Sequence, residues 1–190
     1  MASAEAFAPA QDVRQVHREH ANFVWRSLQR LGVRGAELED AHQEVFIVVY
    51  RKLSTFDGTA KMTSWLFGIC LRVASAARRK AHRRHELLTD VLPERPSGAA
   101  GPETSLERRQ AAAVVDHVLD TLDLEKRAIF VMYEIDQLSC QEIAEVVGIP
   151  LGTVHSRLHT ARKEFQEGIK RSTLRSERSG LSSAPGGDRS

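Results

Sequence analysis

The amino-acid sequence predicts an all-α protein built from two small helical domains. Apolar residues recur at intervals of three and four positions in one segment after another, which is the period of an amphipathic helix. Signals for β-strands are weak. Aromatic residues make up only 6% of the chain, no sustained alternation of apolar and polar residues occurs, and no Asn-Gly dipeptide marks a hairpin.

The first helical domain is expected at residues 13–86, after a disordered N-terminus at residues 1–12. Its first helix is predicted to end near Gly32, since glycine commonly follows the last helical turn. A second helix should cover the segment ELEDAHQEVFIVVYRKL and stop before Asp57-Gly58. A third should follow, because apolar residues recur one turn apart at Trp65, Ile69 and Val73.

A flexible linker is expected at residues 87–105, because this segment contains three prolines and two glycines and has no apolar period. The second helical domain should follow at residues 106–171. Polar residues suited to capping mark the starts of its helices: Thr104 with Glu107, Asp123, and Ser139 with Glu142. Residues 172–190 are rich in serine and glycine and are predicted to form a disordered tail.

The segment SCQEIAEVVGIPLGTVHSRLHTAR has the features of a helix-turn-helix. Gly148 can adopt the left-handed conformation that ends the first helix, and Pro150 stiffens the turn. Thr153 is predicted to cap the second helix, whose free N–H groups can hold a phosphate. The alternative is an ordinary pair of antiparallel helices in a helical core.

The second helix of this motif has one apolar and one polar face. Its apolar stripe is predicted to be buried and consists of Val154, Leu158, Ala161 and Phe165. The opposite side presents residues suited to reading DNA in a major groove: His155, Ser156, His159 and Arg162. Local charge favours the same interpretation. Residues 116–145 contain eight acidic and two basic side chains, whereas residues 153–171 contain five basic and two acidic ones.

A second basic surface is predicted in the first domain. The net formal charge of +2 does not itself indicate nucleic-acid binding, so local patches must. No acidic residue occurs between Asp57 and Glu86, a stretch with seven basic side chains: Lys61, Arg72, Arg78, Arg79, Lys80, Arg83 and Arg84. Trp65 and Phe67 lie near this cluster, and basic groups beside aromatic rings suit a strand with exposed bases. The alternative is that Trp65 belongs to the core and the basic cluster is a solvated helix end.

The composition argues against several classes of protein. Cys70 and Cys140 are far apart and lie in apolar segments, which favours free thiols in a reducing cytoplasm over a disulfide framework. The longest apolar run, residues 45–50, is too short to span a membrane, and no signal peptide is expected. Neither an HExxH motif nor a cysteine beside a histidine pair occurs, so no metal, cofactor or enzymatic activity is predicted.

Two long segments resemble a known family. The segment from Glu39 to Lys80 is similar to region 2 of bacterial sigma factors, and the segment from Val118 to Phe165 is similar to their region 4. No other region stands between them, which is the arrangement of the compact extracytoplasmic-function (ECF) type. The resemblance implies a protein that binds core RNA polymerase, recognises the −35 and −10 promoter elements and helps to open the duplex, without being an enzyme itself.

The resemblance also implies roles for individual residues. Those matching the helix that docks on the polymerase β′ coiled coil are Asp40, Gln43, Glu44 and Phe46. Those matching the −10 element and strand-opening surface are Lys61, Met62, Thr63, Ser64, Trp65, Arg72, Arg78, Arg79 and Lys80. Those matching the −35 recognition helix are Thr153, His155, Ser156, Arg157, His159, Thr160 and Arg162, of which the two arginines are expected to meet phosphates or the edge of that element. Further implied partners are the polymerase β flap and an anti-sigma factor.

Several residues depart from those common in the family. His42 replaces an apolar residue of the polymerase-docking motif, and Met62 and Arg72 replace an aromatic residue and an asparagine. His155 and His159 stand where arginine or lysine is frequent, so the promoter sequence of relatives is not carried over. Two other interpretations remain open: a dimeric helix-turn-helix regulator that binds a palindrome without polymerase, and an all-α enzyme or nuclease with a basic cleft.

Overall fold

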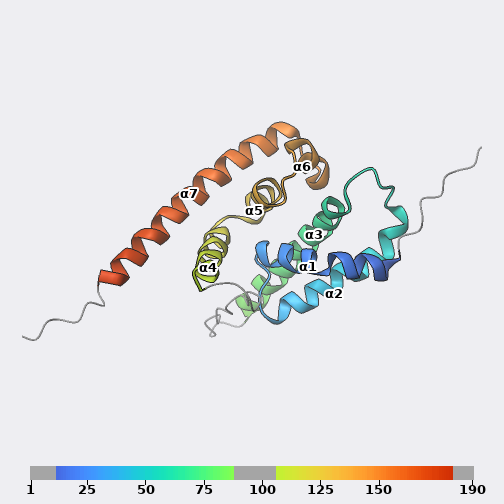
Figure 1. Ribbon diagram of the computed structural model, residues 1–190. Coiled ribbons are helices and arrows are strands. Elements are labelled where there is room, and N and C mark those ends of the chain that lie inside the picture. Colours follow the sequence, from blue (N-terminus) through green and yellow to red (C-terminus); the bar gives the residue numbers. More distant parts are fainter. Residues whose placement is uncertain (1–11, 88–105, 182–190) are drawn as a thin grey trace, which may run out of the picture. The chain divides into compact units, whose positions relative to one another are not determined.

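The computed structural model describes residues 12–87 and 106–181, and every regular element in these ranges is helical (Figure 1). The all-α prediction is therefore confirmed. The chain divides into two compact units, residues 1–94 with 141–149 and residues 95–140 with 150–190. The elements are α1 (Val13–Arg30), α2 (Ala36–Lys52), η1 (Leu53–Thr55), α3 (Met62–Leu87), α4 (Leu106–Thr121), α5 (Leu124–Phe130), η2 (Val131–Ile135), α6 (Cys140–Val147) and α7 (Leu151–Leu181).

The core of the first unit lies where α1, α2 and α3 meet. Its fully buried side chains come from all three helices and include Val24, Leu28, Val45, Val49, Leu66 and Phe67. α1 begins where the Asp12 carboxylate accepts a hydrogen bond from the backbone N–H of Arg14 at 3.0 Å. It ends just before Gly32, whose φ of 89° is the left-handed conformation that favours glycine after a helix, as predicted.

A short loop separates η1 from α3. Asp57 Oδ1 accepts hydrogen bonds from the backbone N–H of Thr59 at 3.0 Å and from its Oγ1 at 2.8 Å. These two hydrogen bonds, the backbone one above all, lower the pKa of the Asp57 carboxyl. Gly58 has a φ of 75°, so the predicted break at this dipeptide is confirmed. α3 then continues without interruption through the basic segment.

The second unit is organised around α7, which packs against both α4 and α5. Asp123 caps α5 as predicted, since its Oδ1 accepts a hydrogen bond from the backbone N–H of Lys126 at 2.9 Å. After Phe130 the chain forms the π-helical turn η2. The rings of Phe130 and Phe165 stack with centroids 4.5 Å apart, which joins α5 to α7.

One arginine is part of this core. Arg127 is 1% exposed, and its Nη1 lies 2.8 Å from Asp120 Oδ1. Its Nη2 donates a further hydrogen bond to the Leu122 carbonyl at 3.3 Å. A buried guanidinium is tolerated only when it is paired in this way, so Arg127 links α5 to the end of α4 and does not face a ligand.

The first residue of the turn between α6 and α7, Gly148, has the conformation that the sequence predicted. Gly148 has a φ of 73°, and its N–H donates to the Ala144 carbonyl at 2.8 Å, which ends α6 as predicted. α7 already begins at Leu151, and the Pro150 carbonyl accepts a hydrogen bond from the N–H of Thr153 at 2.9 Å. The prediction that Thr153 caps this helix is therefore wrong, because Thr153 lies inside the first helical turn.

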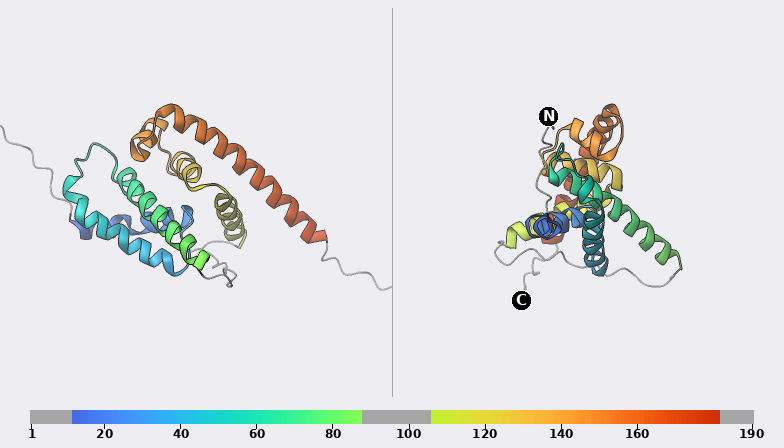
Figure 2. Two further views of the ribbon diagram at one scale, coloured as in Figure 1. Left: turned by 180° about the vertical axis from the view of Figure 1, so that it is seen from behind. Right: turned by 90° about the vertical axis from the view of Figure 1, so that its right-hand side faces the viewer.

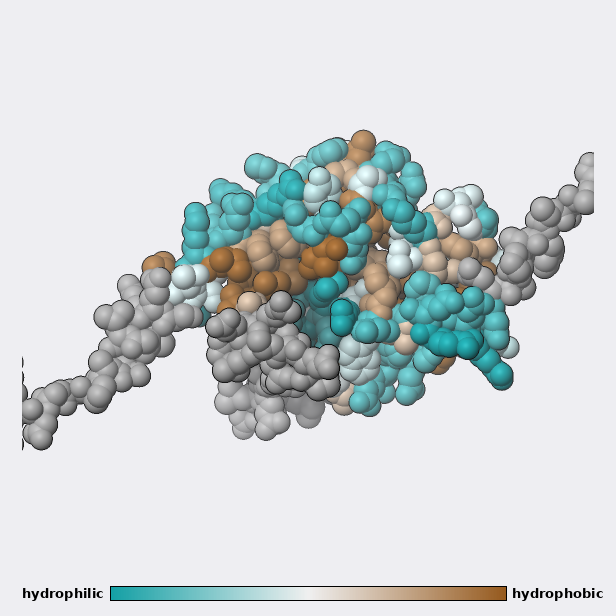
Figure 3. Space-filling view, viewed as in Figure 1, coloured by the Kyte–Doolittle hydropathy of each residue, from teal (hydrophilic) through white to brown (hydrophobic). Residues whose placement is uncertain are grey.

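α7 is longer than the sequence predicted. It continues as a single helix to Leu181 (Figure 2), so the chain is helical where a disordered tail was expected from residue 172. Gly168, in its C-terminal half, is buried beside Val118 of α4. Figure 3 shows hydrophilic side chains along the outer edge of α7 and hydrophobic ones on the side toward α4 and α5. α7 therefore packs against α4 close to the point where the additional helical residues begin.

Candidate nucleic-acid and protein interfaces

One candidate interface lies on α2, in the first unit. Asp40, Gln43 and Glu44 are exposed, and their spacing of three and four residues places them on one face of the helix. Val45 and Val49 are fully buried behind that face. α2 therefore presents two carboxylates and an amide to solvent while its opposite side is held in the core. The structure brings these residues together but does not itself show what they bind.

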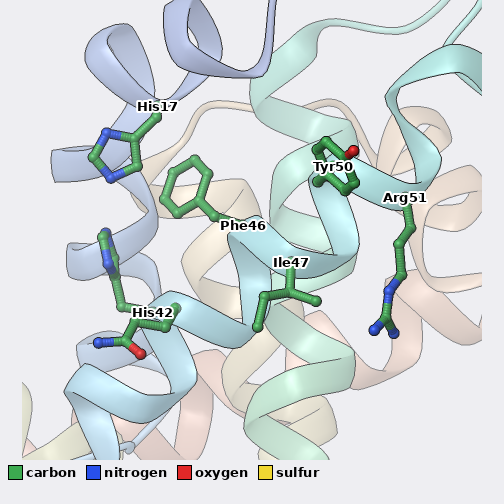
Figure 4. A pocket seen from close by; sticks show the side chains of 7 residues that line it. His17, His42, Phe46, Ile47, Tyr50 and Arg51 are labelled. Atoms are coloured by element: carbon green, nitrogen blue, oxygen red, sulfur yellow. The ribbon is translucent and has the colours of Figure 1, made fainter.

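An apolar groove continues this face along α2. It has a volume of about 480 Å³ and is lined by His17 of α1 and by His42, Gln43, Phe46, Ile47, Tyr50 and Arg51 of α2 (Figure 4). Ile47 is 43% exposed and Tyr50 is 75% exposed, which is unusual for large apolar side chains. Sequence reasoning missed Ile47 and Tyr50. A usable signal was present, because the run VFIVVY is apolar on more sides of the helix than one buried stripe requires.

His42 joins this groove to the core of the first unit. Its ring lies 6.0 Å from that of His17, 5.1 Å from that of Phe46 and 5.5 Å from that of Trp25, measured between centroids. Its Nε2 is 3.2 Å from the Ala21 carbonyl oxygen. Burial lowers the pKa of the His42 imidazole and nearby His17 adds to the effect, while the hydrogen bond to Ala21 opposes it. A neutral ring packed among aromatic rings explains how histidine replaces an apolar residue here.

The predicted −10 residues fall into an exposed group and a half-buried group on α3 and the loop before it. Lys61, Arg72, Arg79 and Lys80 are exposed, whereas Met62, Thr63, Trp65 and Arg78 are half-buried. Trp65 packs against Phe56 with ring centroids 5.3 Å apart, so it is neither a fully buried core residue nor a freely exposed ring. Arg79 donates a hydrogen bond to Ser75 Oγ at 2.6 Å.

Ser64 does not fit the predicted surface. Its side chain is only 3% exposed, and its hydroxyl lies in the core of the first unit among the apolar residues of α3. The helical period explains the difference, because Ser64 shares a face with the buried Phe67 and Gly68. Ser64 is therefore not part of the exposed surface of α3, and its contact with DNA stays a prediction.

The predicted recognition helix has the expected two faces. Val154, Leu158 and Ala161 are buried, and Phe165 is half-buried. His155, Ser156, His159, Thr160 and Arg162 are exposed, while Thr153 and Arg157 are half-buried. The hydroxyl groups of Ser156 and Thr160 donate to the carbonyls of Thr153 and Ser156, at 3.1 and 3.0 Å. Each hydroxyl oxygen therefore remains available mainly as an acceptor.

The two arginines of this helix are held by carboxylates of the same unit. Arg157 Nη2 lies 2.7 Å from Glu125 Oε2 of α5. Arg162 Nε lies 2.6 Å from Glu134 Oε1 of η2, and its guanidinium sits 4.8 Å from the centre of the Tyr133 ring. The hydrogen bond to Glu134 raises the pKa of Arg162. Sequence reasoning assigned both arginines to DNA phosphates, and it missed the acidic partners that already hold them.

His155 and His159 differ from these arginines, because neither forms a hydrogen bond or ion pair within the part of the chain that the structure describes. The outer face of α7 therefore offers two exposed imidazoles flanked by neutralised arginines. Such a face can hydrogen-bond to base edges while carrying little net charge of its own.

The described residues give no structural support for metal binding or for a membrane-spanning helix. Cys70 is buried and Cys140 is half-buried, and no disulfide joins them. Within residues 12–87 and 106–181, no cluster of three or more histidine, cysteine or acidic side chains has the geometry to hold a metal ion. No helix in these two ranges is both long enough and apolar enough to cross a membrane.

Two solved structures share the fold of this chain. The sigma factor RpoE from Bartonella quintana, in complex with the anti-sigma factor NepR, aligns with a TM-score of 0.69 at 21% identity, over 83% of this chain and 96% of that one. CnrH, in complex with the cytosolic domain of CnrY, aligns with a TM-score of 0.57 at 21% identity, over 84% of this chain and 88% of that one. At this level of identity the likeness establishes a sigma-factor fold.

Sequence comparison then establishes the family. Residues 16–84 match Sigma-70 region 2, and residues 112–165 match Sigma-70, region 4. The RNA polymerase sigma factor NccH of Alcaligenes xylosoxydans xylosoxydans is 30% identical over 154 residues, which cover 80% of this chain and 83% of that protein. The chain belongs to the ECF group of the sigma-70 family of RNA polymerase sigma factors.

Another relative is longer than this chain. The ECF RNA polymerase sigma factor SigE of Mycolicibacterium smegmatis is 32% identical over 165 residues, which cover 86% of this chain but only 63% of that protein. The ECF RNA polymerase sigma-E factor of Escherichia coli is 29% identical over 147 residues, covering 73% of this chain and 76% of that protein. The shared part spans both sigma regions.

Proposed function

We propose that this chain is an ECF sigma factor that binds core RNA polymerase, recognises −35 and −10 promoter elements and helps to open the duplex. The observation that carries the proposal is the combination, in one chain with both sigma regions, of an acidic and apolar face on α2 with an exposed polar face on α7. A regulator that only binds DNA needs the second face and has no use for the first. The polymerase, and not this chain, would perform the chemistry.

Polymerase binding is proposed for the α2 face and its groove. Stable protein interfaces place apolar anchors at the centre and polar groups at the rim. Phe46, Ile47 and Tyr50 provide the anchors, while Asp40, Gln43 and Glu44 provide the rim. The family assigns this helix to the β′ coiled coil, and the mixture of carboxylates with an apolar groove suits a helix that carries both basic and apolar residues. The β flap of the polymerase is proposed as a second contact, made by the residues that match region 4 (112–165).

Strand opening is proposed for the start of α3 and its basic side chains. Taking a base out of the stack costs a few kcal/mol, which a pocket and nearby cations must supply. The half-buried Met62, Thr63 and Trp65 form the candidate pocket, without Ser64. The candidate cations that would hold the DNA backbone are Lys61, Arg72, Arg78, Arg79 and Lys80.

Recognition of the −35 element is proposed for the exposed face of α7. His155, Ser156, His159 and Thr160 would meet base edges, because their polar atoms project from the side opposite the buried stripe. Arg157 and Arg162 would reach phosphates only by giving up, or sharing, their bonds to Glu125 and Glu134. Thr153, in the first helical turn, is proposed to lie near the DNA backbone.

An anti-sigma factor is proposed as a regulatory partner. One aligned structure is a complex of the sigma factor RpoE with the anti-sigma factor NepR, and the other is CnrH in complex with the cytosolic domain of CnrY. Their likeness to this chain supports a partner of the same kind but does not identify it. We place the activity in the cytoplasm, where core polymerase and promoter DNA are found, without insertion into a membrane.

The proposed function is tested by transcription in vitro. The purified chain is added to core RNA polymerase on a library of genomic promoters, and the expected result is initiation at two-part, non-palindromic sites that needs both components. Binding of the chain alone to palindromic sites, with no stimulated initiation, would support the dimeric regulator instead. DNA cleavage with a divalent metal would support the nuclease.

A further inference from the structure

A small pocket lies between α4 and α7 in the second unit, away from the faces discussed above. Its volume is about 150 Å³. Its base is the crossing of the two helices at Val118 and Gly168. A Cβ atom on Gly168 would lie only 2.5 Å from Val118 Cγ1, so a glycine is required for this close approach. The backbone at the base of the pocket is therefore held in place by packing.

Two arginines and a histidine lie around this base. Arg171 and Arg175 come from α7, one turn apart, and His117 comes from α4. On α7 the pocket residues follow the spacing of a single helix face, from Gly168 through Arg171 to Arg175. No carboxylate lines the pocket. Thr121 and Ser172 also line it, and Thr121 Oγ1 donates its hydrogen to the Val118 carbonyl at 2.7 Å, so the charged donors of the pocket are its arginines.

The positive charge of the pocket is not neutralised by nearby acids. Arg171 and Arg175 form no hydrogen bond or ion pair with any residue of the described ranges, and the same holds for His117. Two acids of the flanking helices are engaged elsewhere: Asp120 binds Arg127 at 2.8 Å, and Glu164 binds Lys126 at 2.7 Å. Two guanidinium groups are thus held together in a pocket whose lining includes no carboxylate, an arrangement that favours an anionic ligand.

The extension of α7 creates this arrangement. A chain that became disordered at residue 172 would leave Arg171 alone beside α4. Because α7 remains helical to Leu181, Arg175 lies one turn further along the same face and joins the pocket. At a rise of about 1.5 Å per residue, Arg175 is about 30 Å along the helix from His155. The pocket is therefore remote from the proposed DNA-reading face.

We propose that this pocket binds a phosphoryl group, either as inorganic phosphate or as the terminal phosphate of a small phosphorylated molecule such as a nucleotide. Guanidinium groups present paired N–H donors that match the oxygens of phosphate, and charge-assisted hydrogen bonds of this kind are short and strong. A volume of 150 Å³ corresponds to about five water molecules, which suits a phosphoryl group but not a nucleoside. The remainder of a larger ligand would stay outside. This site does not depend on the proposed promoter function.

The experiment titrates the full chain with inorganic phosphate and, separately, with ATP, at constant ionic strength. Binding is followed by calorimetry and by amide NMR shifts at Val118 and Gly168. The test variant is Arg171→Gln/Arg175→Gln. The matched control is Lys163→Gln/Lys170→Gln, which removes the same charge from exposed positions of α7 outside the pocket. All four residues are exposed, so circular dichroism should show both variants folded.

Saturable binding of phosphate or ATP by the unchanged chain is expected, with affinity reduced about tenfold or more in the arginine variant and by less than about twofold in the lysine control. Binding of free phosphate supports a phosphate pocket as such. Binding of ATP alone supports a phosphorylated ligand with contacts outside the pocket. The proposal is overturned if neither ligand binds saturably, if both variants lose affinity equally, or if short duplex DNA displaces the ligand by occupying the same arginines.

Discussion

Arg162 and Glu134 form an ion pair on the surface of the second unit, with Arg162 Nε 2.6 Å from Glu134 Oε1. The residues are 28 positions apart in the sequence, and the Tyr133 ring supports the guanidinium at 4.8 Å. An exposed pair of this kind stabilises a protein by only about 0–1 kcal/mol. A DNA phosphate can therefore replace Glu134, but it must compete for an arginine that is already bound.

Removing the charge of Glu134 should strengthen DNA binding without regard to sequence. Glu134→Gln frees Arg162 to meet phosphates, and we expect affinity of the full chain for any duplex to rise about twofold to fivefold at low salt. Fluorescence anisotropy across a salt series measures this. The control is Glu167→Gln, which removes a charge from an exposed position of the same unit. An equal rise in both variants would mean that net charge, and not release of Arg162, is responsible.

Two exposed positions of α7 carry histidine. DNA binding by α7 should therefore depend less on salt than DNA binding by the same helix with arginine at these positions. Histidine carries less charge than arginine at neutral pH. In the variant His155→Arg/His159→Arg, log K should fall more steeply with log salt concentration, by up to about 0.9 for each new phosphate contact. Anisotropy titrations at several salt concentrations give the slope. A variant slope no steeper than that of the unchanged chain would contradict the idea.

The groove on α2 should contribute more to polymerase binding than the carboxylates beside it do. Ile47→Ala/Tyr50→Ala removes two exposed apolar anchors, and truncating a central anchor of an interface typically costs about 2 kcal/mol or more. Asp40→Ala/Glu44→Ala should also weaken binding, by a smaller and more salt-dependent amount. Surface plasmon resonance with immobilised core polymerase compares them. Glu19→Ala, an exposed acid on α1, is the control, and full retention of binding by both double variants would remove α2 from the interface.

His42 should make the folded chain less stable at acid pH. Its pKa is lowered in the folded state, so the unfolded state binds the proton more readily. The stability that the neutral ring contributes is present above the ordinary histidine pKa of about 6.5 and is lost as pH falls through the lowered value. Urea unfolding between pH 8 and pH 5 should show a smaller loss in His42→Leu than in the unchanged chain. The control is His159→Leu, which removes a histidine from an exposed position.

Replacing Gly168 by alanine, which adds a single methyl group, should already destabilise the protein. A Cβ there would lie 2.5 Å from Val118 Cγ1, so Gly168→Ala should separate α4 from α7 at a cost of about 1–3 kcal/mol. Denaturant unfolding measures the change, and Val118→Ala in the same chain should recover part of it. The matched control is Gly152→Ala, also in α7, where a Cβ meets nothing within 4 Å. That change should be neutral or stabilising by up to about 1 kcal/mol, because it restricts the unfolded chain.

Several features could be predicted from the sequence because short-range signals encode them. The cap at Asp123 and the glycine turn at Gly148 each depend on one residue and its immediate neighbours, and both predictions are confirmed. The buried stripe at Val154, Leu158 and Ala161 follows from helical period alone. Local signals did not predict the two ends of α7. Thr153 resembles a cap but lies inside α7, and the polar segment after residue 171 continues the helix.

The sequence by itself determined the all-α class, the positions of the main helices and the segments that match the sigma family. Periodicity, helix caps and motifs each depend on residues that are close together in the sequence. Tertiary structure decided which side chains are available. Packing buried Ser64, left Ile47 and Tyr50 exposed beside His17, and placed Glu134 against Arg162. These relationships join residues on different helices or depend on which helix face is covered. They are therefore set by how the helices pack against one another, which no single segment of the sequence specifies.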